Sequence, residues 1–396
     1  MTRRTLALAV LTFASAGLVP VASAAAAPSA AGAGHRNVRV CSVPASGSAG
    51  CHAIRRDSVT SSGTVTPNAT PSGYGPADLQ SAYNLPSSTA GSGQTVAIVD
   101  AYDDPNAESD LGVYRSQYGL AACTTANGCF RKVNQSGGTK YPKANGGWAQ
   151  EISLDLDMVS AICPNCHILL VEASSSSLTN LGTAVNTAAR LGANVISNSY
   201  GGSESSSDPS YDASYYNHPG VAITVSSGDS GYGVQYPAAS QYVTAVGGTT
   251  LNRASNTRGW SETVWSGAGS GCSTYDPKPS WQKDSGCTNR TVADVAAVAD
   301  PNTGVAVYDS YSYQGASGWL VFGGTSVAAP VIGSVYALAG NASAVTYGSF
   351  SYAHPGSLND VTSGSNGSCG GSYLCTGGPG YDGPTGLGTP NNTGAF

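Results

Sequence analysis

The chain contains little charge, little histidine and, after its first residues, no long apolar run. Only 10% of its 396 residues are charged, and five are histidines. Beyond residue 24 no stretch approaches the roughly 18 apolar residues that a membrane-spanning helix needs. The 17 basic residues are outnumbered by 23 acidic ones, which argues against a basic surface for nucleic acid. We therefore expect neither a membrane nor nucleic acid as a partner.

The first 24 residues have the pattern of a secretory signal peptide. Arg3 and Arg4 precede an apolar stretch that ends in the small tripeptide Ala-Ser-Ala at 22–24. Residues 1–24 are therefore predicted to be removed on export. We expect the mature protein to be a secreted, extracellular monomer.

Residues 25–76 form a short basic leader, whereas the rest of the chain is acidic. The leader holds four arginines and one acid, Asp57, for a net charge of +3, and residues 77–396 hold 11 basic and 22 acidic residues, for a net charge of −11. Opposite charges predict an attraction between the two parts. We interpret 25–76 as a short propeptide or N-terminal extension, and a disordered linker fits its composition equally well. Residues 77–396 are long enough for one large domain.

The ten cysteines fall in neighbouring pairs, which suits an oxidising compartment. The Cys163–Cys166 pair could also be a redox or zinc motif, but zinc needs about two more ligands and no second such pair lies nearby in the sequence. We therefore predict five short-loop disulfides. The predicted pairs are Cys41–Cys51, Cys123–Cys129, Cys163–Cys166, Cys272–Cys287 and Cys369–Cys375.

Apolar, β-branched runs separated by helical patterns indicate an α/β fold. Residues 179–192 have helical apolar spacing and lie between two strand candidates, which is the alternation of a parallel sheet. We expect a doubly wound, mostly parallel sheet with helices on both faces. The predicted strands are 94–102, 167–173, 193–200, 220–228 and 242–248.

Ser326 is a candidate nucleophile in the stretch 321–331, Val-Phe-Gly-Gly-Thr-Ser-Val-Ala-Ala-Pro-Val. A serine at a helix N-terminus has unpaired backbone amides beside it that could stabilise an oxyanion. Serine also caps helices routinely, so this fragment by itself fits both roles. The presence of a general base for Ser326 would favour the catalytic role over the capping role.

Carboxylates gather in residues 146–162, which read as a mostly apolar helix. Glu151 and Asp155 are four residues apart and share one helix face, while Asp157 points away from them. Two buried acids at this spacing would share a proton and raise the pKa of one of them. An acidic first turn that interacts with the helix dipole is the alternative interpretation.

Asp229 is a third candidate acid, in the segment Ser-Ser-Gly-Asp-Ser-Gly-Tyr-Gly at 226–233. It follows a predicted strand directly, and the carboxyl ends of parallel strands are where α/β sheets bind ligands. Glycines on both sides would let the backbone approach a ligand closely. An ordinary turn aspartate fits the local sequence as well.

Together these segments resemble the sedolisin family of serine-carboxyl peptidases, which have a subtilisin-like fold. The resemblance rests on Gln-Glu-Ile-Ser-Leu-Asp-Leu-Asp (150–157), Ser-Ser-Gly-Asp-Ser-Gly (226–231) and Gly-Gly-Thr-Ser-Val-Ala-Ala-Pro (323–330), in that order. Flanking segments at 76–86, 236–249, 358–364 and 377–390 are similar too. The resemblance implies that residues 77–396 are one peptidase domain acting on polypeptides.

The resemblance also implies roles for the four residues. Glu151 would be the base for Ser326, Asp155 would orient Glu151, and protonated Asp229 would donate to the oxyanion beside the Ser326 N–H. Such a carboxylate device accepts and donates protons in acid. We therefore expect activity in acid that vanishes near neutral pH.

A structural calcium site near the C-terminus is implied in the same way. Asp360 and Asp382 would give carboxylates, and Val361, Gly378 and Gly380 would give carbonyls. Oxygen ligands suit this hard cation. No EF-hand spacing would suggest calcium without the resemblance.

Two other functions remain open at this point. One is an inactive secreted binding protein on the same fold, since fold does not imply function. The other is a subtilisin-type enzyme with Asp100, a histidine and Ser326. Asp100 ends the first predicted strand, where subtilisins keep an aspartate, and we interpret it as structural. We interpret the histidines as structural as well, namely His35, His52, His167, His218 and His354.

Overall fold

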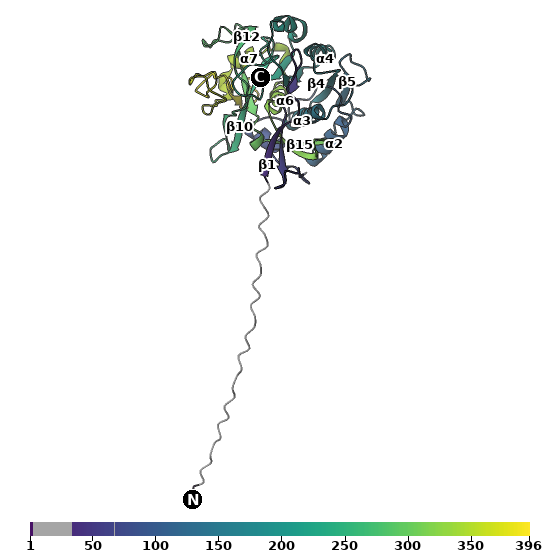
Figure 1. Ribbon diagram of the computed structural model, residues 1–396, viewed down its shortest axis with the longest axis vertical. Helices are drawn as coiled ribbons and strands as arrows, with labels where there is room; N and C mark the ends of the chain where they lie inside the picture. The colour runs from purple at the N-terminus through teal and green to yellow at the C-terminus, as the bar shows by residue number, and fades with distance from the viewer. Residues whose placement is uncertain (3–33, 67) are drawn as a thin grey trace.

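A computed structural model describes residues 1–2, 34–66 and 68–396 of the chain (Figure 1). Most of the predicted signal peptide and residues 25–33 of the leader lie outside the described residues. No helix in the described ranges is long and apolar enough to cross a membrane. The described chain forms one α/β body, and Figure 1 shows its N-terminal strand, β1, at the edge of that body.

An eight-stranded, mostly parallel sheet forms the centre of the body. Its strands are rich in valine, isoleucine and alanine and almost fully buried, because helices or loops cover both faces. Only β11 runs antiparallel to its neighbour, and β14 pairs with β10 beside it. In sheet order the strands are β11 (Trp260–Val264), β10 (Thr244–Arg253), β9 (Ala222–Ser226), β7 (Val195–Asn198), β4 (Thr95–Ala101), β6 (His167–Ala173) and β5 (Phe130–Asn134), with β14 at Val295–Val298.

Helices pack on both faces of this sheet. Helix α3 (Gly146–Ile162) packs against α6 (Thr325–Ala339), and α6 lies along β7, β9, β10 and β14. Helix α4 (Leu178–Arg190) packs on β4 and β6 from the other face. The remaining α-helices are α1 (Pro76–Ala82), α2 (Ala107–Gln117), α5 (Asp208–Tyr211) and α7 (Ser349–Ala353).

The start of α3 is set by its cap. The Asn145 side chain accepts hydrogen bonds from the N–H groups of Gly147 and Trp148, at 3.1 and 3.2 Å, which satisfies two of the free amides of the first turn. Every residue of α3 after Gly146 is buried. The acids on this helix are therefore buried as well.

Part of the predicted leader is built into the body. Strand β3 (Ile54–Val59) pairs with β1 (Gly34–Arg39) and with β16 (Ala316–Gly323) in a second sheet of order β1-β3-β16-β15, and β15 spans Val305–Tyr313. Strand β2 (Gly50–Cys51) pairs with β8 (Tyr200–Gly201). The short pairs β12 (Gly271–Pro277) with β13 (Asn289–Val292) and β17 (Leu358–Asn359) with β18 (Thr389–Pro390) complete the strands.

The leader's arginines do not hold it on the body through ion pairs, contrary to the expectation from opposite charges. Arg36 and Arg55 pair with the leader's own Asp57, at 3.4 and 2.5 Å. Arg39 donates to the backbone carbonyl of Asp229, and Arg56 donates to the carbonyl of Asn302. Among the described residues the leader is held by backbone pairing and hydrogen bonds instead.

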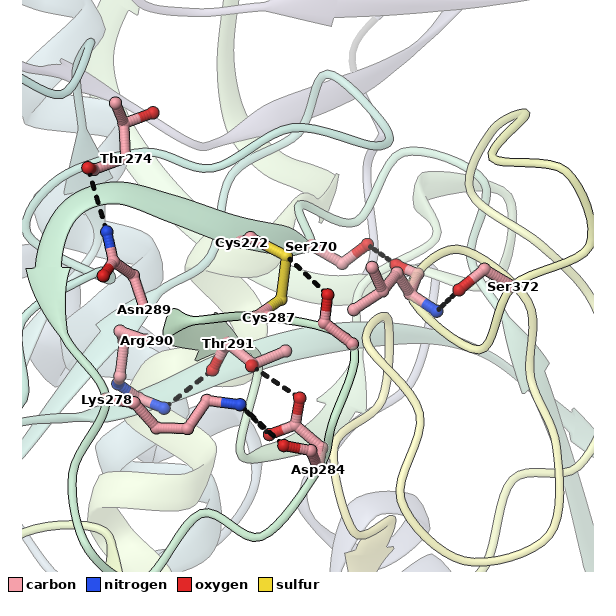
Figure 2. Close-up of a disulfide and its surroundings, with 12 residues drawn as sticks. Ser270, Cys272, Thr274, Lys278, Asp284, Cys287, Asn289, Arg290, Thr291 and Ser372 are labelled. Atoms are coloured by element: carbon pink, nitrogen blue, oxygen red, sulfur yellow. Dashed lines mark hydrogen bonds and ion pairs between the residues drawn. A yellow bond between two sulfur atoms is a disulfide. The ribbon is translucent and has the colours of Figure 1, made fainter.

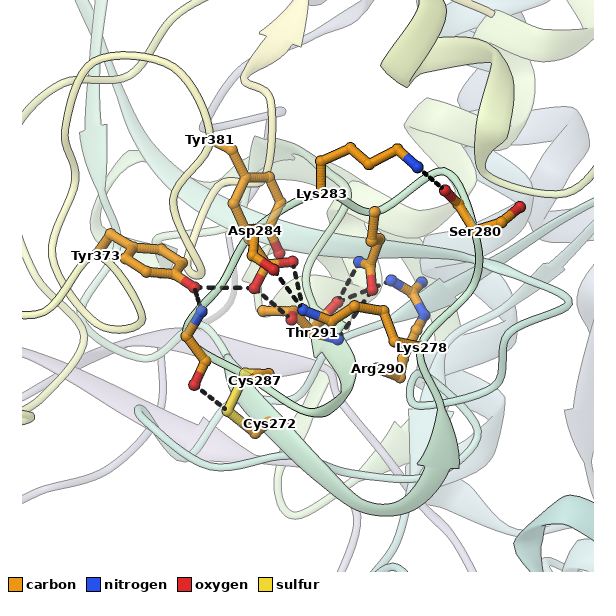
Figure 3. A network of polar contacts seen from close by, with 12 residues as sticks. Cys272, Lys278, Ser280, Lys283, Asp284, Cys287, Arg290, Thr291, Tyr373 and Tyr381 are labelled. Atoms are coloured by element: carbon orange, nitrogen blue, oxygen red, sulfur yellow. Dashed lines mark hydrogen bonds and ion pairs between the residues drawn. A yellow bond between two sulfur atoms is a disulfide. The ribbon is translucent and has the colours of Figure 1, made fainter.

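All five predicted disulfides are confirmed. Figure 2 shows Cys272–Cys287, which joins β12 to the segment just before β13. Figure 3 shows the polar contacts that fix the loop between these strands: Lys278 pairs with Asp284 at 3.0 Å, and the hydroxyls of Thr291 and Tyr373 also donate to Asp284. The loop is therefore tied to the C-terminal segment that carries Tyr373.

The predicted elements agree with the observed ones except at their ends. The strand 167–173 and the helix 146–162 are observed with the predicted bounds, as β6 and α3. The predicted strand 193–200 is divided into β7 and β8, and 242–248 extends to Arg253 because β10 continues as a hairpin with β11.

Candidate active site

Ser326 lies at the start of α6. Gly324 caps this helix with φ of 96°, a left-handed conformation that glycine adopts without strain. A β-carbon on Gly324 would lie 1.8 Å from the carbonyl oxygen of His52, so the position also has no space for a side chain. Ser326 is fully buried, and its hydroxyl donates to the Ser199 carbonyl at 3.2 Å.

Glu151 and Asp155 lie one turn apart on α3 and are fully buried. Glu151 Oε2 accepts from the Ala53 N–H at 2.9 Å, and Asp155 Oδ1 accepts from the Ser199 hydroxyl at 2.8 Å. The other oxygen of each carboxyl has no hydrogen-bond partner among the described residues. Burial raises the pKa of both groups well above the usual range, and the charge of Asp100 raises both further.

The pKa of Glu151 also responds to Ser326. The serine hydroxyl lowers this pKa, against the larger effect of burial, because the two side chains are neighbours. Asp155 and Glu151 affect each other as well, since the charge of Glu151 raises the pKa of Asp155 beyond the larger effect of burial. The structure therefore brings the predicted pair together with each other and with Ser326.

Asp100 is a third carboxyl in this cluster. It lies near the end of β4, is fully buried, and has no hydrogen-bond partner on either carboxyl oxygen among the described residues. Burial raises its pKa to about 8. Sequence reasoning assigned Asp100 a structural role, and the only signal against that role was its position at the carboxyl end of a strand.

Asp229 approaches Ser326 from the segment that follows β9. Its Oδ1 accepts from the N–H and the hydroxyl of Thr325, both at 2.8 Å. Its Oδ2 has no hydrogen-bond partner within the part of the chain that the structure describes. This oxygen would lie 2.7 Å from a β-carbon on Gly324, on the same side as the His52 carbonyl oxygen. Burial raises the pKa of Asp229 to about 7, while the Thr325 N–H and the charge of Arg39 lower it.

No histidine hydrogen-bonds to Ser326 within the described ranges. The ring of His52 lies in the site, but its Nδ1 pairs with Ser226 Oγ at 2.7 Å and its Nε2 with Gln235 Oε1 at 2.9 Å. Both ring nitrogens are therefore occupied. Two of the other histidines form hydrogen bonds elsewhere: His218 with Asn186 and Tyr215, and His354 with Phe350. The remaining two, His35 and His167, are exposed.

Comparisons with known proteins agree with this arrangement. The sequence pattern of the subtilase family matches residues 125–346. The chain belongs to the subtilase family. Kumamolisin of Bacillus sp. (strain MN-32) is 31% identical over 364 residues, which cover 82% of this chain and 63% of the relative. Sedolisin of Pseudomonas sp. (strain 101) is 27% identical over 368 residues, which cover 81% of this chain and 60% of the relative.

The solved structure of Pseudomonas sedolisin, a serine-carboxyl proteinase in complex with two molecules of pseudo-iodotyrostatin, has a TM-score of 0.66 to this chain at 28% identity. The match covers 82% of this chain and 96% of that chain. These relatives confirm the resemblance to the sedolisin family and the subtilisin-like fold. The chain spans about three fifths of the length of the two curated relatives.

The glycine-rich stretch 266–281 lies beside the loop that carries Asp229. The N–H of Gly269 donates to the Gly228 carbonyl, and the N–H of Gly231 donates to the Gly267 carbonyl, both at 2.8 Å. The two glycine-rich segments therefore form one wall of this subtilase site. The loop shown in Figures 2 and 3 continues from that wall.

Four of the five residues predicted to hold calcium contact one another at the C-terminal loop. The N–H of Gly380 donates to Asp360 Oδ2 at 2.9 Å, and the N–H of Gly378 donates to Asp382 Oδ2 at 3.1 Å. The pKa of Asp382 is raised to about 6, mainly by burial and in smaller part by the charge of Asp360. Two carboxylates near enough to repel, on a loop that carries backbone carbonyls, fit a hard cation.

A second acidic group lies elsewhere in the structure. Glu204, Asp208 and Asp276 offer carboxylate oxygens within 4.8 Å of one another. This group shares no residue with the predicted calcium site.

Proposed function

We propose that this chain is a secreted serine-carboxyl endopeptidase that hydrolyses polypeptides in acid through an acyl-enzyme on Ser326. One observation carries the proposal. Glu151 interacts with the buried Ser326, Asp155 accepts from the Ser199 hydroxyl, and Asp229 accepts from Thr325, which precedes Ser326. No histidine of the described chain hydrogen-bonds to the Ser326 hydroxyl. The four residues together supply a nucleophile, a base, an orienting group and an oxyanion donor.

In the proposed cycle Glu151 accepts the proton of Ser326 as the serine oxygen attacks the scissile carbonyl carbon. Asp155 shares a proton with Glu151 and keeps it oriented toward the serine. The negative charge that develops on the carbonyl oxygen is stabilised by the Ser326 N–H, at the free end of α6, and by the proton on Asp229 Oδ2. Glu151 then returns its proton to the leaving nitrogen, and water hydrolyses the acyl-enzyme.

The acid range follows from the carboxyl groups. Asp229 donates only while protonated, and with a pKa of about 7 it carries its proton in acid and loses it above neutral pH. The raised pKa of the Glu151–Asp155 pair also lets the pair hold one proton well above the usual range for carboxyls. We therefore expect hydrolysis to fall as the pH rises through about 7.

Export and a polypeptide substrate are part of the same proposal. The signal-peptide pattern at 1–24 and five disulfides suit a secreted protein. An endopeptidase site must accommodate the substrate polypeptide on both sides of the cleaved bond. Support comes from the leader, which extends past the site in both directions, from β2 to β3. We keep a monomer and the division into 1–24, 25–76 and 77–396 as predictions.

Calcium is proposed as a structural ion. Asp360 and Asp382 would hold it with their carboxylates, and Val361, Gly378 and Gly380 with their carbonyls. The bound cation would offset the repulsion between the two carboxylates and brace the C-terminal loop.

The test is hydrolysis of unfolded casein by the purified protein from about pH 3 to pH 8, with Ser326→Ala alongside. An acid profile that depends on Ser326 is expected. A neutral or alkaline optimum would contradict the carboxylate mechanism and favour a histidine-dependent enzyme. No Ser326-dependent hydrolysis at any pH would favour a binding protein.

A further inference from the structure

Three acids from separate segments meet at one side of the candidate active site. Glu204 follows β8, Asp208 is the first residue of α5, and Asp276 lies on β12, within the glycine-rich stretch 266–281. One carboxylate oxygen of each acid lies within 4.8 Å of the other two. Helix α5 packs against β12, so the group joins parts of the chain that are far apart in the sequence.

The hydrogen bonds that these carboxylates accept come from neutral donors. The Ser205 N–H and hydroxyl donate to Asp208, both at 2.8 Å. The hydroxyl of Ser273 donates to Glu204. Within the described ranges no lysine, arginine or histidine forms an ion pair with any of the three acids. Their negative charge is therefore not matched by a basic side chain.

Asp276 has an oxygen left free in this group. The residue is fully buried, and its Oδ1 has no hydrogen-bond partner among the described residues, while its Oδ2 lies 3.5 Å from the Ser273 hydroxyl. A buried carboxylate is expensive unless it is paired with a cation or coordinates a metal ion. The free oxygen therefore indicates a missing positive charge.

A fourth acid increases the negative charge at this point. Asp212 follows α5 directly and is also buried, and its Oδ2 has no partner in the described part of the chain. The pKa of Asp276 is raised to about 9, mainly by burial and in smaller part by the charges of Asp212, Asp208 and Glu204. All four acids thus lie close together.

The ligand atoms are those of a hard divalent cation. Ca²⁺ takes about six to eight oxygen ligands at roughly 2.3–2.6 Å, so two ligands of one ion are at most about 5 Å apart. The three carboxylate oxygens meet this limit. The group contains neither a thiolate nor an imidazole, the ligands that suit zinc and copper. Its chemistry therefore fits calcium best.

We propose that Glu204, Asp208 and Asp276 bind a Ca²⁺ ion at a second site, separate from the C-terminal loop, and that Asp212 adds negative charge beside it. The ion ties the segment that follows β8 to β12. The site makes no use of Ser326, so it is independent of the peptidase function proposed above.

Both tied segments continue into the candidate active site. The residue before β8 is Ser199, whose carbonyl accepts from the Ser326 hydroxyl and whose own hydroxyl donates to Asp155. The residue before β12 is Ser270, which exchanges two backbone hydrogen bonds with Gly233, at 2.8 and 3.1 Å. The ion therefore braces the glycine-rich wall of the site against the segment that contacts the nucleophile.

The test is titration of the full chain with CaCl₂ at pH 7, followed by calorimetry, in the Ser326→Ala protein, which cannot digest itself. Asp382→Asn is added to remove the predicted C-terminal site. This protein should still bind one Ca²⁺ ion. A further Glu204→Gln or Asp276→Asn should weaken that binding at least about tenfold, because each removes the charge of one ligand.

Two features of these variants keep the result interpretable. Glu204 is only half-buried, and glutamine keeps an oxygen that can accept from Ser273, so Glu204→Gln should fold even if Asp276→Asn does not. Asp284→Asn is the matched control. Asp284 is a largely buried aspartate in the loop after β12, and it pairs with Lys278 at 3.0 Å. Its replacement should leave the calcium affinity unchanged.

The bracing is measured by hydrogen exchange of the same proteins. With calcium at about a hundred times its dissociation constant, residues 202–212 and 271–277 should exchange up to about a hundredfold more slowly than with EDTA. Strand β6, in the central sheet, should exchange equally in both conditions. The slower exchange should disappear in Glu204→Gln and in Asp276→Asn.

Three outcomes would overturn the proposal. One is the absence of calcium binding once Asp382 is replaced, because the acids would then hold protons and no ion. Another is an affinity that changes in neither Glu204→Gln nor Asp276→Asn. The third, binding without slower exchange at 202–212 and 271–277, would remove the bracing role. Casein hydrolysis is measured separately, so each of these outcomes leaves the peptidase function standing.

Discussion

The backbone N–H of Ala53 donates to the carboxylate of Glu151 at 2.9 Å. One partner comes from the N-terminal leader and the other from the buried helix α3. The contact joins a peptide nitrogen to the acid that we propose as the general base. The leader therefore contacts the proposed general base directly.

Glu151→Gln should abolish hydrolysis with little change in folding. Glutamine keeps an oxygen that can accept from the Ala53 N–H but cannot take the serine proton, so we expect a loss of at least about 100-fold in kcat/KM. The matched control is Asp157→Asn on the same helix, because Asp157 accepts from the Tyr308 N–H, away from Ser326. Wild-type activity in Glu151→Gln, measured on casein at pH 4, would exclude this glutamate as the base.

Asp100→Asn should move the high-pH limb of the kcat/KM profile to lower pH and leave the acid limb in place. The charge of Asp100 raises the pKa of both Glu151 and Asp155, and Asp100 carries that charge only as the pH approaches its own pKa of about 8. A purely structural aspartate would change the melting temperature and leave the profile where it was. The kcat/KM of the wild type and of Asp100→Asn, measured from pH 3 to pH 8, distinguishes these two roles of Asp100. A profile that does not move would confirm the structural interpretation.

The folded protein should be most stable in acid. Burial raises the pKa of Asp100 and Asp309 to about 8 and of Asp104 and Asp229 to about 7. The folded chain therefore holds protons that the unfolded chain releases near pH 4. This stabilisation is complete below about pH 4 and is lost as the pH rises through 7 and 8. We expect the melting temperature of Ser326→Ala, which cannot digest itself, to fall by more than about 5 °C between pH 4 and pH 8. A constant or rising value would contradict this.

Removal of calcium should lower stability if the C-terminal loop holds the ion. With EDTA at pH 6 we expect a lower melting temperature in the wild type and a smaller response in Asp382→Asn, which loses one carboxylate ligand. The fall should be reversed by added calcium. A wild-type protein that is indifferent to EDTA and to calcium would contradict the site.

The sequence by itself determined the pieces of the site and most of the sheet. Strands β4, β6 and β9 are short, apolar and β-branched, and such runs can be recognised as buried strands from the local sequence. The i,i+4 spacing of Glu151 and Asp155 placed both acids on one face as soon as α3 was a helix. The short cysteine spacings likewise determined the disulfides, because partners only a few residues apart are held near each other by the chain itself.

Only the tertiary structure decided which of these segments contact one another and how the contacts change the pKa values of their side chains. Asp100 became part of the carboxyl cluster because β4 and α3 pack together, and the pKa shifts come from burial that no local pattern contains. The path of the leader was unpredictable for the same reason. Its bonds join His52 to Ser199 and Ala53 to Glu151, residues about a hundred or more positions away. Strand addition uses backbone groups that every sequence carries. The sequence of residues 34–59 therefore does not indicate which strands of the body this segment pairs with.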